Sequence, residues 1–83
     1  MSTTVYFEEK LYPTDESNGR ADKSKPGKVF ELFRSNYFNN DQIYLKVTDE
    51  KGQEKIVHLS KDQASSLAEG LKSVVGYIGY DNT

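Results

Sequence analysis

Aromatic and basic side chains share a face on two of the strands that this sequence predicts. The run 42–48 carries Tyr44 and Lys46 two residues apart, and the run 55–59 carries His58 on its outward face. Residues two apart in a strand point to the same side of a sheet. Rings in such a row can stack on unpaired bases, while ammonium groups contact phosphates. The pattern indicates a surface for single-stranded nucleic acid, although tyrosine and lysine are also common in inert exposed strands.

Further candidate side chains lie near the ends of the predicted strands. A long segment, 13–27, contains no large apolar residue and is rich in Pro, Asp, Ser, Asn and Gly, which predicts a flexible loop. Its second half is basic, so it is either a solvated loop or a mobile arm that gathers phosphates. The candidate nucleic-acid-binding residues are Lys28, Arg34, Tyr37, Tyr44, Lys46, Lys55 and His58.

Catalytic and metal-binding patterns are missing from the sequence. There is no Cys, and His58 is the single histidine, so a metal site would need carboxylates alone, and no calcium-loop spacing occurs. The glycines fit neither phosphate-loop spacing, and no Gly-x-Ser-x-Gly elbow presents a nucleophile. We expect no enzymatic activity, no cofactor and no metal.

The elements that must position these residues are four strands and a helix. Strand-like runs cover residues 5–12, 28–34, 42–48 and 55–59, and a helical apolar pattern follows Ser60. The order predicts an α+β fold: a four-stranded antiparallel sheet with one C-terminal helix packed on one face. Such a helix leaves the other face open to water or to a partner.

Alternation predicts which side chains face the helix. Ile43, Leu45, Val47, Val57 and Leu59 are expected on the inner face, and Phe30 with Leu32 on the face opposite Val29, Glu31 and Phe33. The first strand is expected to place Val5, Phe7 and Leu11 on a single face.

Local signals mark a turn and the start of the helix. Gly52 suits the positive-φ position of a hairpin turn, and Ser60 with Gln63 forms a capping box. The helix then repeats apolar residues at intervals of three and four, so we expect Leu67 and Leu71 to lie between helix and sheet.

Size and charge limit the remaining possibilities. The 83 residues form one domain with an apolar content of 35%, which supports only a small core, so a homodimer is expected. The net charge of −2 combines acidic ends with a basic middle, which weakly favours a polyanion at the sheet. The sequence has neither a signal-peptide pattern nor a membrane-spanning run, and we expect a soluble, cytoplasmic protein.

The segment 29–75 resembles the positive cofactor four type of single-stranded-DNA-binding transcriptional coactivators, whose wider fold group includes the Whirly proteins. The similarity lies in Lys55, Leu59, the cap Ser60, Asp62 and Gln63. The sequence departs from the family pattern at Ile56, Ala64, Asp49 and Glu50, where the family has a glycine, a tryptophan and aromatic residues.

This resemblance implies a homodimer, joined largely through helices, whose strands cradle single-stranded DNA. It also implies that Lys55 and Arg34 contact phosphates and that Tyr37 and Tyr44 stack on bases. The expected function is sequence-tolerant binding of single-stranded DNA or RNA in transcription, replication or repair, on the open sheet face. The alternative is a non-enzymatic protein-interaction module or small regulator that uses the same face or a sheet edge.

Overall fold

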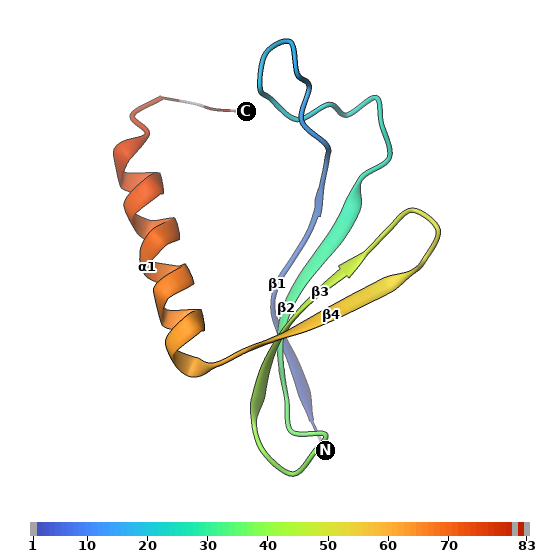
Figure 1. Cartoon of the computed structure of the whole chain (residues 1–83), viewed down its shortest axis with the longest axis vertical. Coiled ribbons are helices and arrows are strands. Elements are labelled where there is room, and N and C mark those ends of the chain that lie inside the picture. Colours follow the sequence, from blue (N-terminus) through green and yellow to red (C-terminus); the bar gives the residue numbers. More distant parts are fainter. Residues whose placement is uncertain (1, 81, 83) are drawn as a thin grey trace.

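The expected order of four strands and one helix is confirmed by the computed structural model, which describes residues 2–80 and 82. One antiparallel sheet contains the strands in sequential order, and the helix follows the last strand (Figure 1). The elements are β1 (Thr3–Leu11), β2 (Lys28–Ser35), β3 (Gln42–Thr48), β4 (Glu54–Leu59) and α1 (Lys61–Tyr77). Within the described residues, no helix is both long and apolar enough to cross a membrane.

The connections between the strands contain local hydrogen-bonded turns. Gly52 has a φ of 82°, as predicted, and its N–H donates to the carbonyl of Asp49 over 3.0 Å in the β3–β4 turn. The long β1–β2 loop contains a small turn. Thr14 and Ala21 form an isolated antiparallel β-bridge, and the N–H of Asp15 donates to the Arg20 carbonyl over 2.7 Å. The loop is therefore locally structured, and its mobility stays a prediction.

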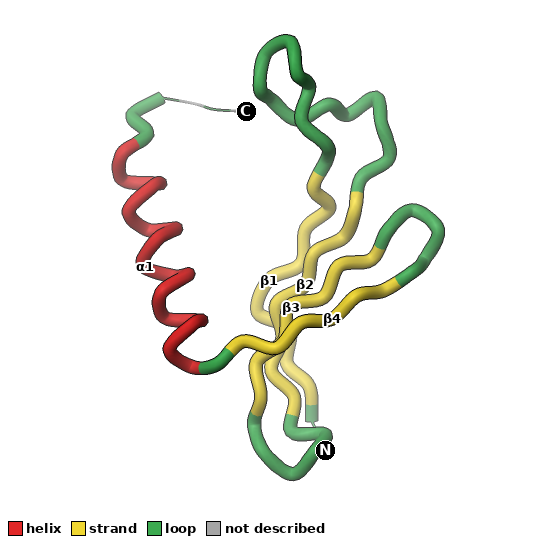
Figure 2. The backbone as a smooth tube through the Cα atoms, viewed as in Figure 1, coloured by secondary structure: helices red, strands yellow, loops and turns green. Residues whose placement is uncertain are grey.

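The pairing register divides the side chains between two faces of the sheet. Leu32 lies opposite Leu45, which lies opposite Val57, so these three share the face on which α1 lies. We call it the helix-side face; it carries Phe7, Leu11, Phe30, Leu32, Ile43, Leu45, Val47, Val57 and Leu59. The opposite face, the ring face, carries Phe33, Tyr44 and His58 with Val5, Glu31, Lys46 and Ile56. Figure 2 shows the twisted strands running side by side.

One prediction for β1 is wrong. The register shifts between Val5 and Phe7, so that Val5 pairs with Phe33 on the ring face while Phe7 pairs with Leu32 on the helix-side face. A β-bulge of this kind adds one residue to a strand and reverses its alternation. Tyr6, the extra residue, lines an apolar groove between sheet and helix.

The start of α1 agrees with the sequence, but its apolar face is not buried. Ser60 accepts from the Gln63 N–H over 3.0 Å, and the Gln63 side chain accepts from the Ser60 N–H over 2.9 Å, which completes the predicted capping box. Leu67 and Leu71 line the groove with the sheet yet remain 44% and 59% exposed. The prediction that they are enclosed between helix and sheet is therefore wrong for the single chain.

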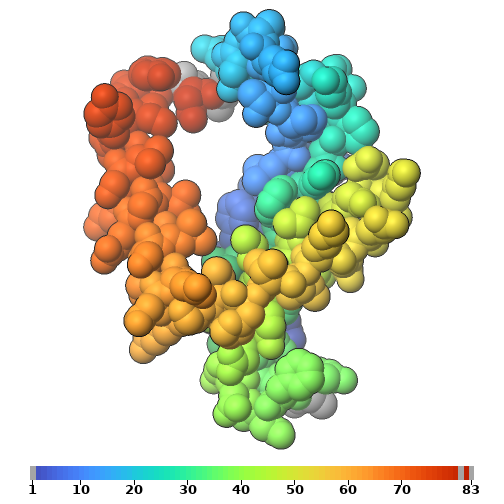
Figure 3. Space-filling view, viewed as in Figure 1, coloured from blue at the N-terminus to red at the C-terminus, as the bar shows by residue number. Residues whose placement is uncertain are grey.

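The reason is that the helix leaves the sheet. Figure 3 shows open space between the C-terminal half of α1 and β1. The radius of gyration is 15.1 Å, whereas a compact chain of this length has a radius of about 12 Å. Among the described residues no hydrophobic side chain is buried, so the chain by itself lacks a closed core.

The loose contact of α1 with the sheet predicts that its stability depends on its own cap. Replacing Ser60 by Ala should destabilise the helix by about 1 kcal/mol, so its amides should exchange with solvent about fivefold faster. Hydrogen exchange followed by mass spectrometry measures this. Ser66→Ala, in the middle of α1, is the control and should not accelerate exchange, because Ala favours helix. Equal exchange in Ser60→Ala and wild type would show that the cap does not hold the helix.

Candidate nucleic-acid interface

Three rings form a row across the middle of the ring face. Register places Phe33 of β2, Tyr44 of β3 and His58 of β4 opposite one another. The Phe33 and Tyr44 rings are stacked, with centroids 5.4 Å apart and an interplanar angle of 28°. The Tyr44 and His58 rings meet edge to face at 6.0 Å, and His58 Nε2 lies 2.7 Å from the Gln42 side-chain oxygen. Each ring of the row therefore contacts a side chain of a neighbouring strand, which fixes its position.

Two more rings extend this row from the β2–β3 turn. Tyr37 and Phe38 are 63% and 69% exposed and meet edge to face, with centroids 5.1 Å apart. The turn is closed at Asn39, which has a φ of 73°, a conformation that Asn tolerates better than most residues. A shallow, almost wholly apolar hollow of about 250 Å³ lies between turn and sheet and is lined by Phe33, Ser35, Tyr37, Phe38, Tyr44 and Ile56.

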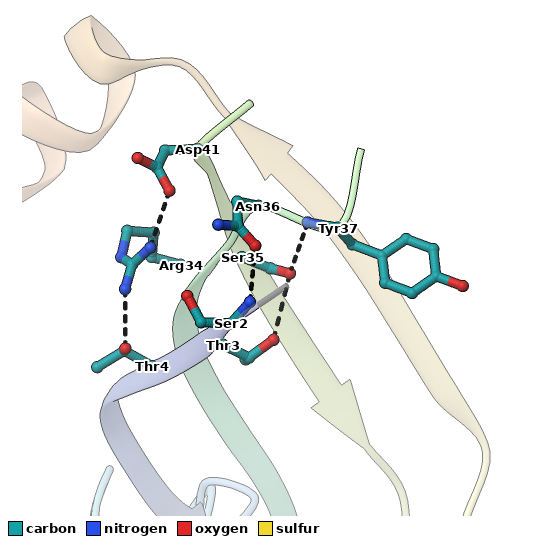
Figure 4. A network of polar contacts seen from close by, with 8 residues as sticks. All are labelled: Ser2, Thr3, Thr4, Arg34, Ser35, Asn36, Tyr37 and Asp41. Atoms are coloured by element: carbon teal, nitrogen blue, oxygen red, sulfur yellow. Dashed lines mark hydrogen bonds and ion pairs between the residues drawn. The ribbon is translucent and has the colours of Figure 1, made fainter. Parts of the chain in front are cut away.

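A polar network anchors this turn to the first strand (Figure 4). Ser35, which is only 7% exposed, accepts from the Tyr37 N–H over 3.2 Å and from the Thr3 hydroxyl over 3.2 Å. The Ser2 N–H donates to the Asn36 side chain over 2.7 Å. These bonds fix the backbone at Tyr37 and leave its ring directed away from the network.

Lys46 lies between two carboxylates on the ring face. Its Nζ is 3.3 Å from Glu31 Oε1 and 3.3 Å from Glu54 Oε2, and it lies 5.8 Å from the centroid of the Phe33 ring. Partial burial lowers the pKa of Lys46, but the hydrogen bonds and charges of Glu54 and Glu31 outweigh this effect, so that the pKa is raised above its ordinary value. The ammonium group therefore stays charged while its charge is neutralised locally.

The charges of the sheet are divided unequally between its two faces. On the ring face the strands place Lys10 and Lys46 against three carboxylates, those of Glu8, Glu31 and Glu54. On the helix-side face they place three cations, Lys28, Arg34 and Lys55, against Glu9 alone. The face that carries the rings is therefore the less basic of the two.

The structure separates the candidate residues into two groups. Tyr44, Lys46 and His58 share the ring face, and Tyr37 lies at its margin. Lys28, Arg34 and Lys55 are on the helix-side face instead, so the interleaving of these cations with the rings is not observed.

Arg34 is further occupied by its own partners. It donates to Asp41 over 2.8 Å and to the Thr4 hydroxyl over 2.9 Å (Figure 4). Hydrogen bonds with Tyr6 and with Asp41 raise the pKa of Arg34 above its ordinary value. It ties the start of β1 to the β2–β3 turn.

The candidate set omitted two rings, Phe33 and Phe38, for different reasons. Alternation had already placed Phe33 on the face opposite Leu32, so its position next to Tyr44 followed from the sequence once the register was known. Phe38 lies in a turn, where alternation gives no direction. Its contact with Tyr37 is visible only in three dimensions.

Comparison with protein-family models finds no match, and comparisons with curated proteins and with solved structures find none either. Within the described residues, no group of three histidine or carboxylate side chains could hold a metal ion. The ring face presents rings for stacking, apolar surface and the charges given above.

The stacked geometry predicts a measurable coupling between Phe33 and Tyr44. In a double-mutant cycle with leucine at both positions, the coupling in the free energy of unfolding should be about 0.5–1.5 kcal/mol, because such aromatic pairs add to area burial. Urea denaturation measures it. A cycle between Phe33 and Val57, on opposite faces, is the control and should give a coupling near zero. Equal couplings in both cycles would mean that the rings do not act as a pair.

Proposed function

We propose that this protein binds single-stranded DNA or RNA on the ring face without strong sequence preference. The observation that carries the proposal is the row of Phe33, Tyr44 and His58, continued by the exposed rings of Tyr37 and Phe38. Stacking on protein rings contributes about 1–3 kcal/mol per base and tolerates any sequence, since every base has two flat faces. The network around Ser35 supports the proposal, because it holds the turn rings ready for stacking.

The distribution of charge indicates which interaction should supply the affinity. Lys46 is held by Glu31 and Glu54, and Lys28, Arg34 and Lys55 lie on the other face. Stacking rather than phosphate contact should therefore supply most of the affinity. The resemblance to the positive cofactor four type of coactivators remains a prediction, and the suggested role in transcription, replication or repair rests on it.

The first test replaces Tyr44 by Ala. Affinity for an unstructured labelled oligothymidylate, measured by fluorescence anisotropy, should fall by about 1–3 kcal/mol, because one stacking surface is lost. The dependence on salt should be shallow and unchanged, since each phosphate contact contributes about −0.7 to the log–log slope and stacking contributes little. A duplex of equal length should bind less well, because pairing hides the faces of its bases.

Two controls make this test specific. Tyr12→Ala removes a ring beyond the end of β1, in a hollow with Leu11 and Phe30, and should leave affinity unchanged. Lys55→Ala should have little effect, contrary to what the family resemblance implies, because Lys55 is on the helix-side face. Absence of binding at about 50 mM salt, or equal losses in Tyr44→Ala and Tyr12→Ala, would contradict the proposal.

The second candidate function is a protein-interaction module. The excess of carboxylates over ammonium groups on the ring face favours it, because that charge repels phosphates but not a neutral or basic peptide. The apolar hollow beside Tyr37 and Phe38 would then receive an apolar side chain. Failure of the oligonucleotide test would favour this function.

We also propose that the protein is a homodimer. The helix-side face and the apolar face of α1 are both open in the single chain, with Leu71, Val74 and Val75 all more than half exposed. A folded domain without buried hydrophobic side chains lacks the main favourable contribution to its stability. A second copy that fills the space between α1 and β1 would supply this burial to both chains at once, as two-fold symmetry allows.

This assembly predicts a sedimentation mass of twice the 9.4 kDa of one chain at micromolar concentration. Leu71→Lys should abolish the dimer and lower the melting temperature, because it places a charge on the face to be buried. Ser66→Lys, which adds the same charge five residues earlier on the polar side of α1, is the control and should remain dimeric. A wild-type protein that sediments as a folded monomer would refute the dimer.

A further inference from the structure

The position of Lys46 suggests how the ring face discriminates between ligands. Its ammonium group is a strand cation in the middle of that face, next to the Phe33 ring, and it lies 3.3 Å from each of two carboxylates. Its side chain is 21% exposed, that of Glu31 is 17% exposed and that of Glu54 is 52% exposed. Glu54 is therefore the partner that solvent or a ligand reaches most easily.

We propose that Glu31 and Glu54 are specificity-determining residues. By pairing with Lys46 they prevent it from contacting phosphates, so the ring face binds the flat faces of bases in preference to the anionic backbone of the nucleic acid. The inference rests on the proposed function and adds a role for these carboxylates that the rings alone do not supply. A phosphate near Lys46 must either displace Glu54 or approach a cluster whose net charge is negative. A base stacked on Phe33 or Tyr44 meets neither obstacle.

The register explains why the three side chains meet. Glu31 lies directly opposite Lys46 on β2. Glu54 lies on β4 two residues before Ile56, the direct partner of Lys46, and is therefore its diagonal neighbour on the same face. Direct and diagonal neighbours on one face are within reach of long side chains. The cluster is thus built into the pairing of three strands, and it does not depend on a flexible loop.

The test is to neutralise the more exposed carboxylate. Glu54→Gln should raise affinity for a labelled oligothymidylate of about 15 nucleotides by about two- to fivefold and steepen the log–log salt slope by about 0.7, since Lys46 then keeps Glu31 as its one carboxylate partner and its solvent side can contact one phosphate. Glu50→Gln, in the β3–β4 turn, removes the same charge and should change neither quantity. The slope separates a freed cation from a change in folding, which would lower affinity without adding a phosphate contact.

The same substitution in a variant without the Lys46 ammonium group tests whether the effect of Glu54→Gln depends on Lys46. In Lys46→Met, which keeps the apolar stem, adding Glu54→Gln should leave the salt slope unchanged, because no ammonium group is there to be freed. An equal steepening in both backgrounds would overturn the inference, and so would wild-type behaviour of Glu54→Gln.

The binding experiments distinguish a failure of this inference from a failure of the proposed function. Binding by wild type that falls in Tyr44→Ala but does not respond to Glu54→Gln supports stacking and overturns the role of the carboxylates. Absence of binding by wild type, Glu54→Gln and Glu31→Gln alike overturns both. Binding that appears only when a carboxylate is neutralised contradicts the proposed function of the wild-type protein and overturns the inference, because the wild-type ring face then selects no bases.

Discussion

Alternation of side chains across the paired strands is the constraint on which the rest of the structure depends. Because direct cross-strand partners share a face, one register decides at once that Leu32, Leu45 and Val57 meet on one side and Phe33, Tyr44 and His58 on the other. The apolar side receives α1, and the aromatic side remains open. The bulge at Tyr6 is the exception, since it moves Val5 to the ring face and lets Tyr6 line the groove beside α1.

Local chemistry could be predicted from the sequence wherever neighbours in the chain determine it. The strands, the positive φ of Gly52 and the capping box of Ser60 all depend on residues within a few positions of one another. The bulge could not be predicted, because it depends on how β1 fits against β2. Enclosure of Leu67 and Leu71 failed as a prediction for a different reason: periodicity shows that a helix has an apolar face, but it does not show which surface covers that face.

The candidate site likewise contains residues whose position follows from local sequence and residues whose position does not. Tyr44, Lys46 and His58 share one face of the sheet, as alternation within well-defined strands predicts, while their role in binding stays a prediction. Lys28, Arg34 and Lys55 are basic and near strand ends, which makes them candidates, but alternation places them on the helix-side face. The pairing of Lys46 with Glu31 and Glu54 joins three strands, so it required the register of the whole sheet.

Dimerisation on one face of the sheet and ligand binding on the other do not exclude each other. The helix-side face carries most of the apolar side chains of the sheet beside three cations, and it is incompletely covered. Burying its apolar part against a second copy would supply a core that the described residues of one chain lack. The rings lie on the other side of a single sheet layer, so such an assembly would leave them accessible. Stability would then come from association on one face. The ring face could keep Tyr37 and Phe38 exposed and Phe33 and Tyr44 half-buried, although a monomer of this size would need such side chains for its own core. Association on the helix-side face would thus explain both why no hydrophobic side chain is buried among the described residues and why the rings of the opposite face remain accessible.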